Sequence, residues 1–408
     1  MADIKAFRGL RPRQDIVHLV AELPYDVVTS DEARKITANN NYSFYHITKP
    51  EVDLPPSTDQ YDPQVYRKGA DNLEDFISSG VLRYEEKPCL YLYTLVMDGR
   101  SQTGLVTCIS IDDYLNNTVK KHELTREDKE IDRMTHVDVQ NAHTGLVYLL
   151  YHEDGSVKER FQHALTTTPV YDYTASDGIR HTIRIVDDPD MVKGFIASFS
   201  NIDLYIADGH HRAASAVKVG LKRREQNPAA PADSEHNYFL GVIFPHDQLR
   251  ILPYNRTVRD LNGFSPDEFI DKVKAHYTVE KTGLSVPEKK NTLCMYIDRQ
   301  WYVLTPAFDI PDDPIESLDV KILQDRILNP VLGIQNPRTD KRIDFIGGIK
   351  GADELTRIVD SGECAVAFSM YPTSVEDLMD VADSGGIMPP KSTWFEPKLR
   401  SGLIIHRI

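Results

Sequence analysis

Cysteine is scarce in this chain of 408 residues, which contains only four: Cys89, Cys108, Cys294 and Cys364. They lie far apart, and no two of them form a CxxC pair. A zinc site built from thiolates and a disulfide framework both need closely spaced or numerous cysteines, so the sequence predicts neither. Three of the four stand in apolar, strand-like runs, which is typical of buried thiols.

Long hydrophobic runs are missing as well. No apolar run approaches the ~18 residues that are typical of a membrane-spanning helix. The N-terminal stretch MADIKAFRGLRPRQD also lacks the apolar core of a signal peptide. We therefore expect a soluble, cytoplasmic protein without a membrane partner.

Positive charge is in short supply, because 47 Lys and Arg residues stand against 62 Asp and Glu residues, a formal net charge of -15. Proteins that bind nucleic-acid backbones use clustered Lys and Arg to release counterions, so we expect no nucleic-acid partner. The phosphate-binding pattern GxxxxGK[ST] is absent too. Any phosphate site must therefore be built in another way.

The composition is that of a folded protein with more than one hydrophobic core. Hydrophobic residues make up 41% and charged residues 27%, which are ordinary globular values. Strand-like runs alternate with helix-like stretches, so the fold class is α+β, a mixture of both structures. The strand-like runs are 90–97, 105–111, 145–151, 182–186, 202–207 and 238–244, and helix-like stretches include 63–79 and 191–199.

The pattern of expected helices and strands changes after residue 262. The segment SPDEFIDKVKAHY reads as a helix, and NTLCMYIDRQWYVL reads as a hairpin that turns at Asp298 and Arg299. A strand followed by a helix is expected in ECAVAFSMYPTSVEDLMDVADSG. We therefore expect an N-terminal domain of residues 1–262 and a smaller C-terminal α/β domain of residues 263–408.

Residues 204–220, LYIADGHHRAASAVKVG, gather polar side chains where a strand becomes a helix. Residues 208–212 then lie at the helix N-terminus, where free N–H groups and the helix dipole favour an anion. Gly209 lets the backbone approach that anion closely. Side-chain donors follow at His210, His211 and Arg212. The pattern predicts a phosphate site.

Two other interpretations of this turn stay open. Asp208 also suits a simple N-cap residue, with the histidines half-buried or facing solvent. Alternatively, the turn helps to hold a metal, together with His122, Glu123, His136 or His181. No HExxH helix supports a metal site made by the protein alone, whereas Mg²⁺ carried in by a nucleotide needs only one carboxylate such as Asp208.

Two further polar clusters accompany the turn. The segment VKKHELTREDKEIDRMTH, residues 119–136, has the mixed charge of an exposed helix, but it also contains His122, Glu123, Arg133 and His136. The segment MPPKSTWFEPK, residues 388–398, reads as a proline-rich surface loop. Its two prolines also favour an extended backbone just before Lys391, Ser392 and Thr393. The ammonium group of the lysine and the two hydroxyl groups suit phosphate oxygens.

Together these clusters resemble the free-serine kinases of the ParB/sulfiredoxin-like superfamily. Over nearly its full length the chain is also similar to a large bacterial and archaeal family long catalogued as a domain of unknown function. The segments that carry the resemblance are LPYDVV, KKHELT, LYIADGHHR, LPYNRTV and MPPKSTWFEPKLRSGL. The kinases similarly carry a His-Glu pair, then Asp-Gly-His-His-Arg after a strand, then Pro-Lys-Thr-Thr or a near relative. In this chain the matching residues are His122-Glu123, Asp208 to Arg212, and Pro390 to Thr393.

The resemblance implies a ParB/sulfiredoxin-like nucleotide-binding core with large insertions, which transfers a phosphoryl group from ADP or ATP to the hydroxyl of free serine or a similar small metabolite. It implies Glu123, Asp208 and His211 as catalytic residues, with Glu123 as general base and Asp208 at Mg²⁺. The implied nucleotide-binding residues are Gly209, His210, His211, Arg212, Lys391, Ser392 and Thr393. The implied substrate-binding residues are His122, Arg133 and His136.

The chain departs from the kinase pattern by a long segment before the His-Glu pair and a larger gap between Glu123 and Asp208. Further candidates for a substrate pocket within these insertions are Asp26, Asp132, Asn141 and His181. Sulfiredoxin chemistry needs a cysteine at the turn, so that reaction is excluded. The ParB role needs DNA, and the acidic net charge speaks against a DNA partner. A nucleotide or phosphate hydrolase, a nucleotide-binding regulator without catalysis and a metal-dependent hydrolase remain as alternatives.

Overall fold

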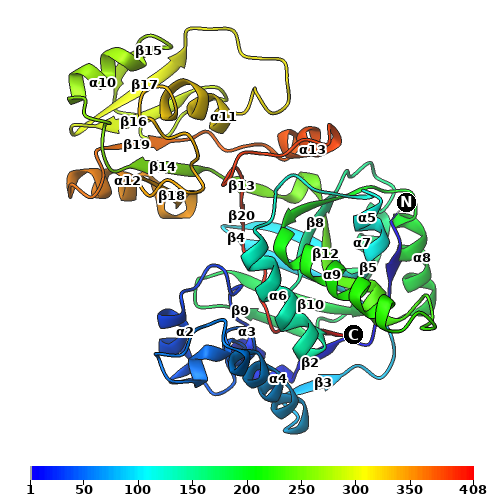
Figure 1. Ribbon diagram of the computed structural model, residues 1–408. Coiled ribbons are helices and arrows are strands. Elements are labelled where there is room, and N and C mark those ends of the chain that lie inside the picture. The colour runs from blue at the N-terminus through cyan, green and yellow to red at the C-terminus, as the bar shows by residue number, and fades with distance from the viewer. Residues whose placement is uncertain (1) are drawn as a thin grey trace. The chain divides into compact units, whose positions relative to one another are not determined.

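The computed structural model describes residues 2–408, which form two compact units of mixed α/β structure (Figure 1). The first unit runs to Leu249 and also includes Pro397–Ile408, and the second is Arg250–Glu396. Strands β13 (Arg250–Leu252) and β20 (Trp394–Glu396) pair where the chain enters and leaves the second unit. This division differs from the expected one after residue 262, because a change of local pattern cannot show that a chain returns to its first unit.

The first unit is built on a large sheet. Within residues 2–408, nine strands form it in the order β6-β11-β8-β12-β5-β4-β10-β9, with β1 paired to β5. Most neighbours are antiparallel, but β6 and β11 are parallel, as are β8 and β12. The bounds are β1 (Ile4–Lys5), β4 (Leu90–Met97), β5 (Arg100–Ser110), β6 (Val119–Lys120), β8 (Val147–Tyr151), β9 (Tyr171–Thr174), β10 (Arg180–Val186), β11 (Leu204–Asp208) and β12 (Tyr238–Pro245). Six of these strands confirm the strand-like runs expected from the sequence.

Helices bury the apolar side chains of this sheet. They are α5 (Ile111–Leu115), α7 (Lys158–Ala164), α8 (Pro189–Phe199) and α9 (His210–Gln226). Ala213 and Ala216 of α9 share one buried cluster with Ile206 of β11 and Leu149 of β8. Because burying one Leu or Ile side chain contributes about 1.5–3 kcal/mol, this cluster holds β11 and α9, and so the turn between them, in place.

The N-terminal segment forms a helical layer with its own apolar cluster. It contains β2 (Leu10–Pro12), α1 (Val17–Val20), α2 (Ser30–Thr37), α3 (Tyr45–Thr48), α4 (Pro63–Ser78) and β3 (Leu82–Tyr84). A capping box begins α2, since Thr29 and Glu32 bond reciprocally. Helix α6 (Glu127–Gln140) packs against both α4 and α9 (Figure 1). The N-terminal layer is thereby connected to the helix that carries the polar turn.

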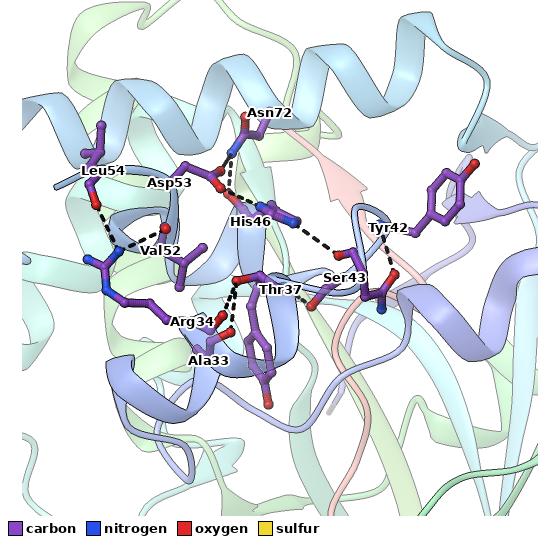
Figure 2. Close-up of polar contacts among 12 residues, drawn as sticks. Ala33, Arg34, Thr37, Tyr42, Ser43, His46, Val52, Asp53, Leu54 and Asn72 are labelled. Carbon is purple, nitrogen blue, oxygen red and sulfur yellow. Dashed lines mark hydrogen bonds and ion pairs between the residues drawn. The ribbon is translucent and has the colours of Figure 1, made fainter. Parts of the chain in front are cut away.

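A polar cluster ties α3 to α4. Nδ1 of His46 lies 2.7 Å from Oδ1 of Asp53, and the amide of Asn72 donates both to Oδ2 of Asp53, at 2.7 Å, and to the backbone carbonyl of His46, at 2.6 Å. Figure 2 shows these three side chains converging. The cluster fixes the layer that contains the LPYDVV segment.

The segment that follows the second unit, Pro397–Ile408, belongs to the first unit and pairs with its strands. Strand β21 (His406–Arg407) pairs with β7 (Ala142–His143), and Ser401 forms a bridge with Glu22. The buried guanidinium of Arg400 pairs with Asp177 and lies 3.4 Å from Nε2 of His181. Burial lowers the pKa of His181 to about 3, so its neutral ring can accept this hydrogen bond.

The second unit contains a sheet whose order is β15-β17-β16-β19-β14-β18. Its elements are β14 (Tyr254–Val258), α10 (Pro266–Val273), β15 (Tyr277–Thr282), β16 (Leu293–Ile297), β17 (Gln300–Pro306), α11 (Asp319–Leu323), β18 (Ile343–Gly347), α12 (Gly351–Asp360), β19 (Val366–Ser369) and α13 (Val375–Asp383). The expected hairpin is confirmed: Asp298 and Arg299 have positive φ values of 46° and 60°, as a tight two-residue turn requires. Among the described residues, none of the helices is both long and apolar enough to cross a bilayer.

The contact between His46 and Asp53 predicts a pH-dependent stability. Burial alone would lower the pKa of His46, but Asp53 raises it overall; the pKa of Asp53, which burial alone would raise, is lowered overall by His46. The pair therefore stabilises fully below the ordinary histidine pKa of about 6.5 and above the ordinary carboxyl pKa of about 3.9. Its contribution disappears as pH rises through the raised pKa of His46 or falls through the lowered pKa of Asp53.

We expect His46→Gln to lower the free energy of unfolding most between about pH 4 and pH 6.5, and progressively less at higher pH. Urea unfolding followed across this range measures the difference. His18→Gln, at an exposed histidine on α1, is the control and should give only a small difference. A His46→Gln difference that stays constant up to pH 9 would contradict the assignment.

Candidate functional site

The expected turn from strand to helix is present, with Gly209 between the end of β11 and the start of α9. Gly209 has φ 97° and ψ 31°, a left-handed conformation that favours glycine. A Cβ atom at this position would lie only 2.9 Å from Cζ and Nε of Arg212. Glycine therefore serves two purposes here: it allows the turn, and it leaves room for the guanidinium that folds back over it.

The carboxylate of Asp208 lies between two cations. Its Oδ2 is 3.6 Å from a terminal nitrogen of Arg212 and 3.5 Å from Nζ of Lys398. Burial alone would raise the pKa of Asp208, but the charges of Lys398 and Arg212 outweigh it and lower the pKa below the ordinary range. Asp208 is therefore ionised at neutral pH. Lys398 gave no signal in the sequence beyond its place in the last hallmark segment.

His122 and Glu123 lie beside the turn, as the resemblance implied. The rings of His122 and His210 meet edge to face, with centroids 4.5 Å apart, and the backbone N–H of His122 donates to Nε2 of His210 at 3.5 Å. Burial lowers the pKa of His122 to about 4 and that of His210 well below its ordinary value, so both rings are neutral at pH 7. With Nε2 accepting, His210 carries its proton on Nδ1, which faces Oε2 of Glu123 at 3.7 Å.

The two adjacent histidines have different surroundings. The side chain of His210 is buried, whereas His211 is partly exposed. Nε2 of His211 accepts from the backbone N–H of Arg126 at 3.1 Å, and burial lowers the pKa of His211. A neutral His211 therefore carries its proton on Nδ1 and can donate from that atom.

A cavity of about 40 Å³ adjoins the turn, and Arg212 contributes to its wall. Two residues expected to bind substrate, Arg133 and His136, also line it, together with Tyr25 from the LPYDVV segment. The guanidinium of Arg133 lies 4.0 Å from the ring centroid of Tyr25 and pairs with Asp132 at 2.8 Å. The structure thus brings these expected substrate residues to one cavity beside the turn.

Other candidates lie elsewhere. His181 is in the buried network of Arg400, and Asn141 ends α6 in a left-handed conformation while it accepts from Arg223 at 2.5 Å. The segment of Lys391, Ser392 and Thr393 belongs to the second unit. There the backbone carbonyl of Lys391 accepts from Arg256 at 3.0 Å, and the hydroxyl of Ser392 donates to Pro389 at 2.7 Å. A role for this segment in nucleotide binding stays a prediction.

Metal ligands are not gathered in the part of the chain that the structure describes. Within residues 2–408, no three or more His, Cys, Asp or Glu side chains are arranged to hold a metal ion. Asp208 is the carboxylate at the turn, and its side chain is 32% exposed. A divalent cation at this turn would need most of its ligands from a bound phosphate and from water.

Comparisons with known proteins agree with the family expected from the sequence. Residues 4–321 match the family described as Protein of unknown function (DUF1015). The chain therefore belongs to this family. No curated protein matches the chain significantly.

Among solved structures, a free serine kinase in complex with AMP is 13% identical, with 71% of this chain and 86% of that chain covered at a TM-score of 0.35. A conserved hypothetical protein from Pyrococcus furiosus is 14% identical, with 72% and 93% covered at 0.35. C-terminally truncated SbnI from Staphylococcus aureus is 10% identical, with 71% and 82% covered at 0.36. These likenesses are too weak to assign a ligand or an activity.

The geometry of the turn predicts that Gly209→Ala destabilises the protein for two reasons, the left-handed φ and the displaced guanidinium of Arg212. We expect a loss of about 1–2 kcal/mol from the backbone alone, and a further loss because the pair with Asp208 is disturbed. Gly155→Ala is the matched control, since Gly155 has φ 95° and no atom within 4 Å of the added Cβ. Thermal unfolding measures both variants. Equal losses would show that Arg212 does not depend on the space at Gly209.

Proposed function

We propose that this protein is a small-molecule phosphotransferase, which moves a phosphoryl group from ADP or ATP to the hydroxyl of free serine or a similar small metabolite. The observation that carries the proposal is the position of Glu123 beside the turn at residues 208–212, with Oε2 3.7 Å from Nδ1 of His210. This proximity joins two of the three motifs that resemble the free-serine kinases. The side chain of Glu123 is 41% exposed, so a substrate can reach it.

The donor phosphates would bind at the N-terminus of α9. Among the described residues, no side chain caps the first turn of this 17-residue helix, so its N–H groups can serve an anion. His211 adds a donor at Nδ1, and Arg212 adds a positive charge on a side chain that is 11% exposed.

The chemical step needs positioning and one proton acceptor. The substrate hydroxyl loses its proton to the carboxylate of Glu123, and its oxygen forms a bond to the terminal phosphorus of the donor. The bond between that phosphorus and the bridging oxygen breaks, so that AMP leaves when the donor is ADP, and ADP leaves when it is ATP. His210 would keep Glu123 in place through the Nδ1 proton that faces it.

Asp208 suits Mg²⁺ that arrives with the nucleotide. The carboxylate is ionised and partly exposed, and Mg²⁺ in phosphoryl-transfer sites often takes only one or two protein carboxylates. When bound, the ion would neutralise charge on the donor phosphates. In its absence Lys398 and Arg212 balance the charge of Asp208.

The test is to incubate the purified protein with Mg²⁺, ADP or ATP, and a panel of hydroxyl amino acids, and to detect phosphorylated products by mass spectrometry. We expect phosphorylated serine or a close relative. Glu123→Gln should lower the rate about 10²- to 10⁴-fold, because a general base is lost, while calorimetry shows unchanged nucleotide binding. Glu127→Gln, at an exposed carboxylate on α6, is the control and should keep the rate.

Three outcomes would contradict the proposal. Phosphate release that ignores added amino acids would indicate a hydrolase. Nucleotide binding without turnover of any acceptor would indicate a regulator. A Glu123→Gln variant with a normal rate would remove Glu123 from its role as base.

A further inference from the structure

One residue that lines the cavity beside Arg212 has a buried polar atom without a partner. His143, on β7, lines this cavity, and only 5% of its surface is exposed. Its Nε2 is buried and has no hydrogen-bond partner within residues 2–408. A buried ring nitrogen without a hydrogen-bond partner costs free energy. Such an atom in the wall of a cavity therefore indicates a bound ligand or water molecule.

The protonation of this ring follows from a chain of three side chains. Nε2 of His406 lies 2.7 Å from Oε2 of Glu235, and Nδ1 of His406 lies 3.1 Å from Nδ1 of His143. The two histidines are paired directly across strands β7 and β21. The carboxylate of Glu235 needs a donor, so His406 carries its proton on Nε2 and its Nδ1 accepts from His143.

His143 therefore carries its proton on Nδ1 and offers an unprotonated Nε2. Burial lowers the pKa of both His143 and His406, which keeps both rings neutral. The free Nε2 is an acceptor in a neutral ring, so its missing partner must be a donor, such as an ammonium or a hydroxyl group.

Positive charge lines the same cavity. The guanidinium of Arg212 donates to the backbone carbonyl of Leu146 and faces Asp208, and Asp132 accepts from Nε of Arg133 at 2.9 Å. Each guanidinium has five N–H donors, more than these contacts use. Two guanidinium groups in one cavity suit a carboxylate.

The size of the cavity limits the ligand further. A single water needs roughly 10–15 Å³ measured in this way, so about 40 Å³ holds a few waters or a molecule with a few non-hydrogen atoms. A nucleotide is far too large for this space.

We infer that this cavity binds a small amino acid, whose carboxylate contacts Arg133 and Arg212 and whose ammonium group donates to Nε2 of His143. As the place of the phosphoryl acceptor, the site rests on the proposed function. The binding of the amino acid itself does not require a nucleotide, because Arg133, Arg212 and His143 contact the amino acid directly and not through a phosphate.

The test measures binding in the absence of nucleotide by calorimetry, with serine, glycine, acetate and ethanolamine as probes. Serine and glycine should bind more tightly than acetate, which lacks the ammonium group, and than ethanolamine, which lacks the carboxylate. His143→Phe should weaken serine about tenfold, the loss of one good hydrogen bond to a charged group, and leave acetate unchanged. His143→Gln, whose side-chain oxygen can accept, should restore part of the serine affinity.

A second variant covers the case in which His143→Phe does not fold. Gly145 lines the cavity, and a Cβ at this position would lie 3.3 Å from Cδ of Arg212 and 4.0 Å from Oγ of Ser401. Its backbone is outside the left-handed region, so Gly145→Ala is conformationally allowed. We expect it to weaken serine, glycine and acetate together.

The outcomes separate this site from the proposed reaction. If serine binding depends on His143 but no phosphorylated product forms, the amino-acid site is supported and the proposed kinase activity is rejected. Phosphorylated serine formed with the same KM by wild type and His143→Phe would keep the kinase and overturn the site. Failure of all four probes to bind, or serine affinity unchanged in both variants, would show that Nε2 of His143 contacts water only.

Discussion

The ion pairs of Asp208 with Arg212 and Lys398 organise the site. A half-buried carboxylate is stable as an anion only when cations balance it, and these two come from different parts of the chain. Arg212 belongs to the helix that follows the turn, and it reaches back over Gly209 because that residue has no side chain. Lys398 belongs to the C-terminal segment. One charge thus connects the strand, the helix and the end of the chain.

The same arrangement gives Arg212 a second role. Its guanidinium is held by Asp208 and by the carbonyl of Leu146, and it also lines the cavity that Arg133 and His143 share. The proposed phosphate site and the proposed amino-acid site therefore have one residue in common. Their closeness is what transfer between two bound molecules requires. A displacement of this one side chain would disturb both sites.

Local sequence patterns are enough to predict part of this site. The strand β11, the turn and the helix α9 follow from the hydrophobic period and from glycine at a left-handed position. The approach of Glu123 to this turn came only from the resemblance, because it depends on β6, a strand of two residues that pairs with β11. So short a strand has no period to recognise. Which histidines are neutral depends on burial, which no local pattern gives.

The contact between His143 and His406 lies beyond any local signal, since 263 positions separate the two residues. It exists because the chain completes its first unit only after it has made the second. While the protein is being synthesised, residues up to Leu249 leave the ribosome without the strand that pairs with β7 and without the lysine that balances Asp208. All residues of the second unit, Arg250–Glu396, are therefore synthesised before the last residues of the first unit. The pairing of β21 with β7 and the charge balance of Asp208 both depend on residues that follow the second unit in the sequence.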